Sequence, residues 1–184
     1  MLTLSDPPAG LNFRRALNTK QDSILCTVEI MNTATTQWST AADLPRPLAF
    51  ASAAVCDDQV YILGRSNMYT CSVTTLTQPR SSNIVGVWSQ IAAPLVTQTT
   101  CVSIQGRLLV IGGRDSDREP TTAVHMYNPT TDSWEVISHM GTPRWQCITA
   151  VLPNNQLMVV GGCTGKEYNT ETDSTELAAI ELLP

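Results

Sequence analysis

The stretch "AVHMYNPTTDSWEVISHM", residues 123–140, repeats a pattern that the chain has already used once. Residues 28–44 read "VEIMNTATTQWSTAADL", and in both stretches an Asn stands six positions ahead of a Trp. Trp88 lies between the two, so that a Trp recurs about every fifty residues. Repetition at this period predicts a fold assembled from one small structural unit used several times.

Each unit has the same internal order of strand and turn signals. The apolar runs "LLVIGG" (108–113), "LMVVGG" (157–162) and the weaker "VYILGR" (60–65) follow a shorter apolar run and a predicted two-residue turn. The three turns are expected at Asp57-Asp58, Gln105-Gly106 and Asn154-Asn155, because each pair contains a residue type that tolerates positive φ. An alternating segment and a Trp-containing segment complete the unit, which predicts four short antiparallel strands.

This pattern resembles the kelch repeat of the β-propellers. Matching residues are Gly112-Gly113 and Gly161-Gly162 after the second strand, Tyr127 in the third strand, and Trp134 six residues beyond Asn128. Arg65 departs from the pattern, because it takes the place of the second glycine in one unit. The resemblance implies an all-β fold, a propeller arc of four-stranded antiparallel blades. It also implies structural roles for Gly112, Gly113, Gly161, Gly162, Tyr127, Trp38, Trp88 and Trp134.

The repeat also predicts how the chain is divided. We expect residues 1–23 to be an N-terminal extension or linker and residues 24–184 to be the propeller segment. Within that segment we expect a partial blade at 24–44, complete blades at 45–93 and 94–140, and a second partial blade at 141–184. Since propellers close with about four to eight blades, one chain is expected to form an incomplete arc.

Three alternatives follow from an incomplete arc. The chain is a piece of a longer product, or a marginally stable arc, or it completes itself with a second copy. It begins with the strands that its last unit lacks, so two copies that exchange ends would form a homodimeric six-bladed propeller.

Composition limits the classes of partner and location. A net charge of −5 with scattered Lys and Arg argues against a nucleic-acid partner, and no apolar run is long enough to span a bilayer. The N-terminus lacks the pattern of a secretory signal, so a cytoplasmic location is expected. The six cysteines form no C-x-x-C pair and the two histidines have no metal-binding spacing, so we expect buried thiols, no metal and no cofactor.

Arginines at the expected blade rims are the candidate binding residues. The guanidinium group holds a carboxylate through two parallel hydrogen bonds, which favours a partner protein or an acidic peptide. The candidates are Arg46, Arg65, Arg114, Arg144 and Trp145. The loop "RDSDREPT" (114–121) is equally consistent with a solvated hairpin whose charges satisfy each other.

The expected function is therefore a non-enzymatic protein–protein interaction module, in the manner of kelch proteins that serve as the substrate-recognition part of a larger adaptor. No G-x-S-x-G turn or H-E-x-x-H motif is present. The alternative is a fragment of a catalytic kelch propeller that acts on a sugar, of the mutarotase or oxidase type, because the resemblance includes such enzymes and fold alone does not exclude catalysis.

Overall fold

The computed structural model describes residues 24–65, 67–76, 87–165 and 180–183. The expected extension at 1–23 lies outside these residues. Within the described part of the chain, thirteen strands form four antiparallel sheets, and one helical turn is the only helix. The prediction of an all-β fold with four-stranded antiparallel sheets is confirmed.

The four sheets follow one another along the chain. The first pairs β1 (Glu29–Asn32) with β2 (Gln37–Thr40). The second contains β3 (Ser52–Cys56), β4 (Gln59–Leu63), β5 (Met68–Ser72) and β6 (Ser89–Ile91), with α2 (Val73–Leu76) after β5. The third contains β7 (Thr100–Ile104), β8 (Arg107–Ile111), β9 (Ala123–Asn128) and β10 (Ser133–His139). The fourth contains β11 (Ile148–Val151), β12 (Leu157–Val160) and β13 (Ile180–Leu183).

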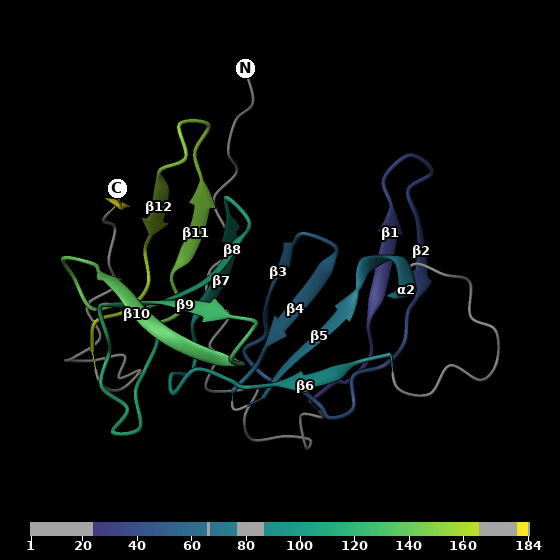
Figure 1. Cartoon of the computed structure of the whole chain (residues 1–184), viewed down its shortest axis with the longest axis horizontal. Coiled ribbons are helices and arrows are strands. Elements are labelled where there is room, and N and C mark those ends of the chain that lie inside the picture. Colours follow the sequence, from purple (N-terminus) through teal and green to yellow (C-terminus); the bar gives the residue numbers. More distant parts are fainter. Residues whose placement is uncertain (1–23, 66, 77–86, 166–179, 184) are drawn as a thin grey trace, which may run out of the picture.

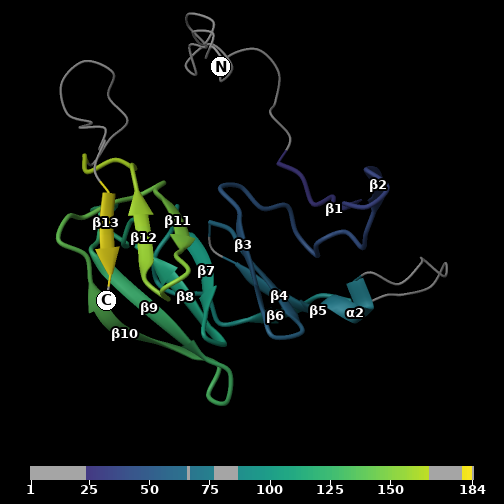
Figure 2. The same ribbon diagram turned by 90° about the horizontal axis from the view of Figure 1, so that it is seen from above.

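The sheets are arranged like neighbouring blades of a propeller (Figures 1 and 2). In each of the last three sheets the strands pair in chain order, so β3, β7 and β11 each form one edge. These three edge strands contact one another in series, β3 with β7 and β7 with β11. The contact between equivalent edges brings the starts of successive units to a common inner side of the arc.

Two of the three predicted tight turns are present. Asp57-Asp58 joins β3 to β4 and Gln105-Gly106 joins β7 to β8, with positive φ at Asp57, Gln105 and Gly106. The third connection is longer than predicted, because the ladder of β11 and β12 ends at the pair Val151–Leu157 and leaves residues 152–156 as the loop. Asn155 still supplies a positive φ there, at 63°.

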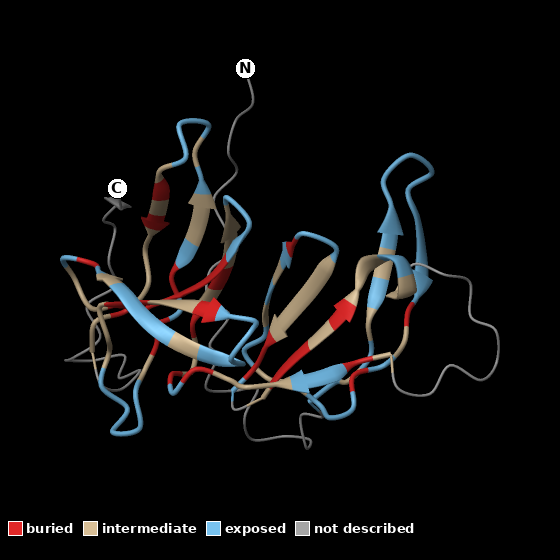
Figure 3. Cartoon of the chain, in the orientation of Figure 1, coloured by how far each residue is buried: buried red, intermediate tan, exposed pale blue. Residues whose placement is uncertain are grey.

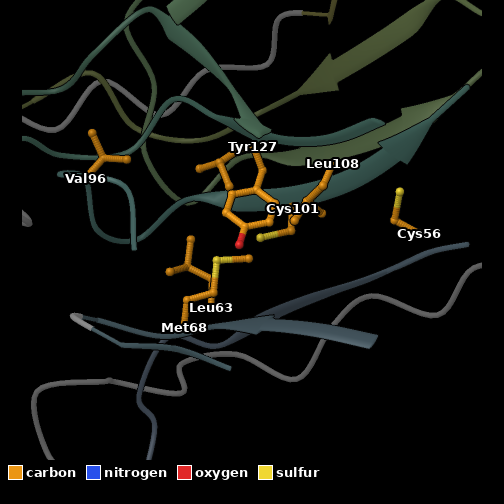
Figure 4. Close-up of a cluster of buried hydrophobic side chains, with 8 residues drawn as sticks. Cys56, Leu63, Met68, Val96, Cys101, Leu108 and Tyr127 are labelled. Carbon is orange, nitrogen blue, oxygen red and sulfur yellow. The ribbon is translucent and has the colours of Figure 1, made fainter. Parts of the chain in front are cut away.

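The core lies between the sheets rather than in one central mass. One cluster joins the second sheet to the third and contains Leu63 and Met68 from one side and Leu108, Val110 and Tyr127 from the other (Figure 4). A second cluster joins the third sheet to the fourth through Ile111, Val124, Leu157 and Val159, among others. A third joins the segments on either side of the β1–β2 hairpin to the second sheet, around Leu44, Tyr69, Cys71 and Trp88. The second, third and fourth sheets therefore bury apolar side chains against a neighbouring sheet.

Two tryptophans bind the backbone of the preceding unit in the same way. Trp88 Nε1 donates to the carbonyl of Ala42 at 2.9 Å, and Trp134 Nε1 donates to the carbonyl of Ala92 at 2.8 Å. Tyr127 packs beside Trp134 with ring centres 5.1 Å apart and donates its hydroxyl to Asp132. Trp38 differs, because 65% of its surface is exposed. The β1–β2 sheet is exposed along most of its length (Figure 3).

The six cysteines are free thiols, five of them buried and Cys26 partly so. Burial raises the pKa of Cys101 to about 12 and that of Cys147 to about 11. These two thiols are protonated near neutral pH and are weak nucleophiles there. In the described residues we find no helix that is long and apolar enough to cross a membrane.

Candidate functional site

A pocket of about 260 Å³ lies where the second and third sheets meet at one rim. Arg65 lies two residues after the end of β4 and Arg114 lies three residues after the end of β8, so the two residues follow corresponding strands of neighbouring units, one position apart in the repeat. The described lining residues carry three guanidinium groups, two polar side chains and one aromatic ring, and none is acidic. They are Phe50, Arg65, Thr97, Gln98, Arg114 and Arg118.

The loop after β8 holds Arg114 and Arg118 in a fixed hairpin. Arg114 exchanges two backbone hydrogen bonds with Thr97, at 2.9 Å and 2.8 Å, and its Nε donates to the carbonyl of Arg118 at 2.9 Å. The carboxylate of Asp115 accepts the backbone N–H groups of Asp117 and Glu119. Both of these hydrogen-bond donors to the Asp115 carboxylate are backbone N–H groups of the loop, and neither is an arginine side chain.

Trp145 supports the Arg114 side chain from the third inter-unit joint. The guanidinium carbon of Arg114 lies 4.6 Å from the centre of the Trp145 ring, within the range of a cation–π interaction. Trp145 itself is only 2% exposed, and its Nε1 donates to the carbonyl of Gly165 at 2.9 Å. A buried, hydrogen-bonded indole under the guanidinium group limits the directions in which Arg114 points.

The glycine pair after β8 allows this close packing. Gly113 has a φ of 102° and its N–H donates to the carbonyl of Arg144 at 2.7 Å. A Cβ atom at Gly113 would lie 2.6 Å from the carbonyl oxygen of Thr97 and would also meet the Thr99 side chain. In the second sheet Gly64 and Arg65 do not have positive φ values. The backbone therefore follows a different path in this unit, where Arg65 stands in place of the second glycine.

Three residues that are not glycine hold left-handed backbone at equivalent places. Phe50, Gln98 and Gln146 have φ values of 54°, 57° and 53°, and each stands two residues ahead of the first strand of its sheet. Positive φ is uncommon for such residues, and strained backbone of this kind gathers at functional sites. Phe50 and Gln98 line the pocket.

The structure places two of the five predicted binding residues in the described pocket lining and a third, Trp145, behind Arg114. Arg65 and Arg114 line the pocket, whereas Arg46 is exposed and is not among the described lining residues. Arg144 is 1% exposed, and its guanidinium donates to the carbonyl of Gly161 at 2.8 Å. Both Arg144 and Trp145 therefore face the interior of the fold, and their direct contact with a partner stays a prediction.

Four lining residues were not among the predicted binding residues. In the sequence Arg118 is one of several acidic and basic residues in the loop at 114–121, and Thr97 belongs to no recognisable motif, so neither is indicated as a binding residue. Phe50, Gln98 and Gln146 recur at a spacing of 48 residues, which is a usable signal, but Phe50 differs in side-chain type from the two glutamines. Among the described residues we find no cluster of His, Cys, Asp and Glu that could hold a metal ion.

Comparison with known proteins identifies the repeat. A family model described as the Kelch motif matches residues 96–141. Kelch-like protein 33 of Homo sapiens is 27% identical over 135 residues, which cover 71% of this chain and 25% of the relative. An F-box/kelch-repeat protein of Arabidopsis thaliana is 32% identical over 77 residues, or 41% of this chain and 20% of the relative.

A relative with an enzyme's name also matches. The N-acetylneuraminate epimerase of Shigella boydii is 31% identical over 140 residues, which cover 71% of this chain and 36% of the relative. The chain thus spans 20% to 36% of the length of these three relatives.

Proposed function

Because the chain belongs to the kelch-repeat family, we propose that it is a non-enzymatic protein-interaction module whose rim pocket binds an acidic segment of a partner protein. The observation that carries this proposal is the pocket between the second and third sheets. Its described lining places three guanidinium groups around one hollow without a carboxylate among them.

The three arginines have different parts in the proposed binding. Arg65 and Arg118 are exposed and line the same pocket, so both side chains are accessible to a carboxylate that enters it. Arg114 is partly buried and held by Trp145, which gives the pocket one fixed donor. A fixed guanidinium loses less side-chain freedom on binding and therefore favours affinity.

The other lining residues define which acidic segment fits. Phe50 is 53% exposed and offers an apolar surface beside the charges, and Thr97 and Gln98 offer hydrogen-bonding groups. A segment that combines Asp or Glu with an apolar side chain matches this lining. Arg144 and Trp145 act in this proposal by positioning Arg114, and Arg46 is a peripheral contact on the rim.

Anisotropy titration with short fluorescent peptides tests the proposal. The probe is a fluorescein-labelled peptide containing Asp, Glu and Leu, and its neutral counterpart carries Asn and Gln instead. We expect the acidic peptide alone to bind, and the Arg65→Ala/Arg118→Ala double variant to weaken binding at least about tenfold, the equivalent of 1.4 kcal/mol. Both residues are exposed, so the double variant is expected to keep its fold.

The chain offers a matched control in Arg107. It is an exposed arginine at the first residue of β8, the end of the strand opposite to Arg114. Arg107→Ala is expected to leave peptide binding unchanged. Equal loss in Arg107→Ala and in the double variant would mean that the peptide follows net charge and not the pocket.

A sugar-acting enzyme is the second candidate, and the 31% identity to an N-acetylneuraminate epimerase favours it. N-acetylneuraminate carries a carboxylate, for which the pocket arginines are also suitable ligands. Proton NMR of N-acetylneuraminate with catalytic amounts of the protein separates the two candidates. Faster exchange between its anomers, abolished by Arg65→Ala/Arg118→Ala, would replace the interaction proposal with the enzymatic one.

An adaptor role in the cytoplasm extends the same proposal. In it, the pocket selects the protein that a larger assembly acts on. Localisation of a fluorescent fusion, followed by identification of proteins that bind the wild type but not Arg65→Ala/Arg118→Ala, tests this extension.

A further inference from the structure

The pocket between the second and third sheets gathers more positive charge than one carboxylate neutralises. Arg65, Arg114 and Arg118 line it, and no described lining residue is acidic. Among the described residues we find no carboxylate that forms an ion pair with these three guanidinium groups. A carboxylate carries one negative charge and two oxygens, which a single guanidinium group satisfies through two parallel hydrogen bonds. One Asp or Glu of a partner would therefore leave two of the three arginines without a counter-charge.

One short loop holds Arg114 and Arg118 at the pocket. Arg114 Nε donates to the carbonyl of Arg118 at 2.9 Å, and in the described part of the chain no acceptor is found for its two terminal nitrogens. Arg118 has a φ of 65°, and its backbone N–H donates to the carbonyl of Asp115 at 3.1 Å. Strained backbone of this kind gathers at functional sites. The loop thus fixes the Arg114 guanidinium and the backbone from which Arg118 extends.

The same loop carries three acidic residues, which limit the kind of anion that fits. Asp115, Asp117 and Glu119 are all exposed, and none of them is among the described lining residues. A partner segment with several Asp or Glu residues along it would bring some of its carboxylates near those of the loop, and like charges repel. An anion that concentrates its charge inside the pocket avoids this repulsion.

A phosphate group matches the pocket better than a carboxylate does. On a serine or threonine side chain it carries about −1.5 to −2 charges near pH 7 and three acceptor oxygens, to which three guanidinium groups can donate. The pocket has a volume of about 260 Å³, below the roughly 300–1,000 Å³ of pockets that enclose a drug-sized ligand, so it suits a single side chain. Thr97 and Gln98 add neutral donors, and Phe50 offers an apolar surface to the carbon atoms that carry the phosphate.

We propose that the pocket binds a phosphorylated serine or threonine of the partner protein, so that phosphorylation of the partner strengthens its binding to this chain. The inference rests on the proposed function, because it names the residue of the acidic segment that enters the pocket. Clusters of arginines recognise phosphorylated motifs in other protein classes by the same charge-assisted hydrogen bonds. Arg114 is the fixed donor to the phosphate, and Arg65 and Arg118 supply the additional charge.

Three matched peptides test the inference by fluorescence anisotropy. They share one neutral, Leu-containing sequence with a fluorescein label and differ only at the central residue, which is phosphoserine, Asp or Ser. The phosphoserine peptide is expected to bind at least about tenfold more tightly than the Asp peptide, and the Asp peptide more tightly than the Ser peptide.

The three affinities separate this inference from the proposed function on which it rests. Equal affinities of the phosphoserine and Asp peptides, both above that of the Ser peptide, would overturn the phosphate inference and leave the acidic-segment proposal standing. Equal affinities of all three peptides would overturn both.

The pH dependence of binding provides a readout that needs no substitution. The second pKa of the phosphate is about 6, so the doubly charged form falls about fourfold between pH 7.5 and pH 5.5. The affinity of the phosphoserine peptide is expected to fall several-fold over this range, whereas the Asp carboxylate stays ionised and its peptide changes little. None of the described lining residues titrates in this range. Identical pH profiles of the two peptides would contradict binding of the doubly charged phosphate.

Arg118→Gln and Arg107→Gln form a matched pair of variants. Both arginines are exposed, but only Arg118 lines the pocket, and Gln at position 118 keeps the backbone carbonyl that accepts Arg114 Nε. The affinity ratio of the phosphoserine and Asp peptides is expected to fall at least about threefold in Arg118→Gln and to stay unchanged in Arg107→Gln. An unchanged ratio in Arg118→Gln, or an equal fall in both variants, would overturn the assignment of the phosphate to this pocket.

Inorganic phosphate distinguishes a partner's side chain from a free anion. The peptide adds the contacts of its neighbouring residues, so inorganic phosphate is expected to displace the phosphoserine peptide only at least about a hundredfold above the Kd of that peptide. Displacement by inorganic phosphate at concentrations near that Kd would mean that the pocket is a site for the free anion, and would overturn recognition of a phosphorylated partner.

Discussion

At the scale of single residues, Gly113 shows how closely chain segments pack at the rim. Its φ of 102° favours glycine, and a Cβ atom would meet the carbonyl of Thr97 and the Thr99 side chain. Gly113→Ala is therefore expected to lower the free energy of unfolding by more than about 1 kcal/mol. Urea unfolding followed by tryptophan fluorescence measures the change.

A substitution at Gly106 distinguishes the two causes of the stability loss expected in Gly113→Ala, which are backbone strain and steric clash. It also has a positive φ, of 70°, but a Cβ atom there would be no closer than 3.7 Å to the Asp57 carboxylate. Gly106→Ala adds backbone strain without a steric clash, so its effect is expected to be smaller than that of Gly113→Ala. Equal losses would refute the close approach at Gly113.

His125 gives the stability a specific pH dependence. Burial, and secondly the nearby His139, lowers the pKa of His125 from its usual 6.5. Because folding disfavours the protonated ring, the contribution of His125 is complete above pH 6.5 and is lost as the pH falls through the lowered pKa. Urea midpoints measured from about pH 7 to pH 5 are expected to fall less steeply in His125→Gln than in the wild type. Parallel slopes would contradict this role of His125.

At the scale of strands and sheets, stability depends on the side chains between neighbouring sheets. Leu63 is 2% exposed at the end of β4 and packs against the third sheet. Leu63→Ala is expected to cost about 2–5 kcal/mol, the usual range for a buried leucine. Leu95→Ala, at a position 92% exposed, is expected to change stability by less than about 0.5 kcal/mol. Thermal melts compare the two, and similar melting temperatures would contradict the inter-sheet core.

The strands could be predicted because periodic apolar runs and turn residues are local signals. Connection lengths were harder to predict. Asn154-Asn155 looks like a tight turn, yet the pairing of Val151 with Leu157 leaves five residues in the loop. The register of two paired strands is set by which side chains must face the neighbouring sheet, and the length of the turn follows from that register.

The binding residues could be predicted only in part, for a related reason. Arg65 and Arg114 follow strands that were visible in the sequence, so their place at the rim could be predicted. The burial of Arg144 could not, because it depends on the carbonyl of Gly161, which follows β12 in the same unit. Single-sequence patterns place a residue relative to its own strand but do not show which segments of the chain pack on its side chain.

At the scale of the whole molecule, the sheets are expected to unfold together. Two clusters link the second, third and fourth sheets in series, and a third links the segments beside the β1–β2 hairpin to the second sheet. Circular dichroism and tryptophan fluorescence are therefore expected to report the same urea midpoint. Two separate midpoints would indicate that one of these clusters couples its sheets weakly.

The left-handed backbone shared by Phe50, Gln98 and Gln146 has a consequence for engineering. Glycine relieves the strain at each position, so Gln146→Gly is expected to raise the free energy of unfolding by about 0.5–1 kcal/mol without altering peptide affinity. Gln98→Gly is expected to raise the free energy of unfolding by a similar amount but to weaken binding of the acidic peptide. Urea unfolding and the anisotropy titration measure the two effects, and unchanged peptide affinity in Gln98→Gly would contradict the role of Gln98 in the pocket. Selection for heat resistance alone is therefore expected to weaken peptide binding, since two of these three positions also line the pocket.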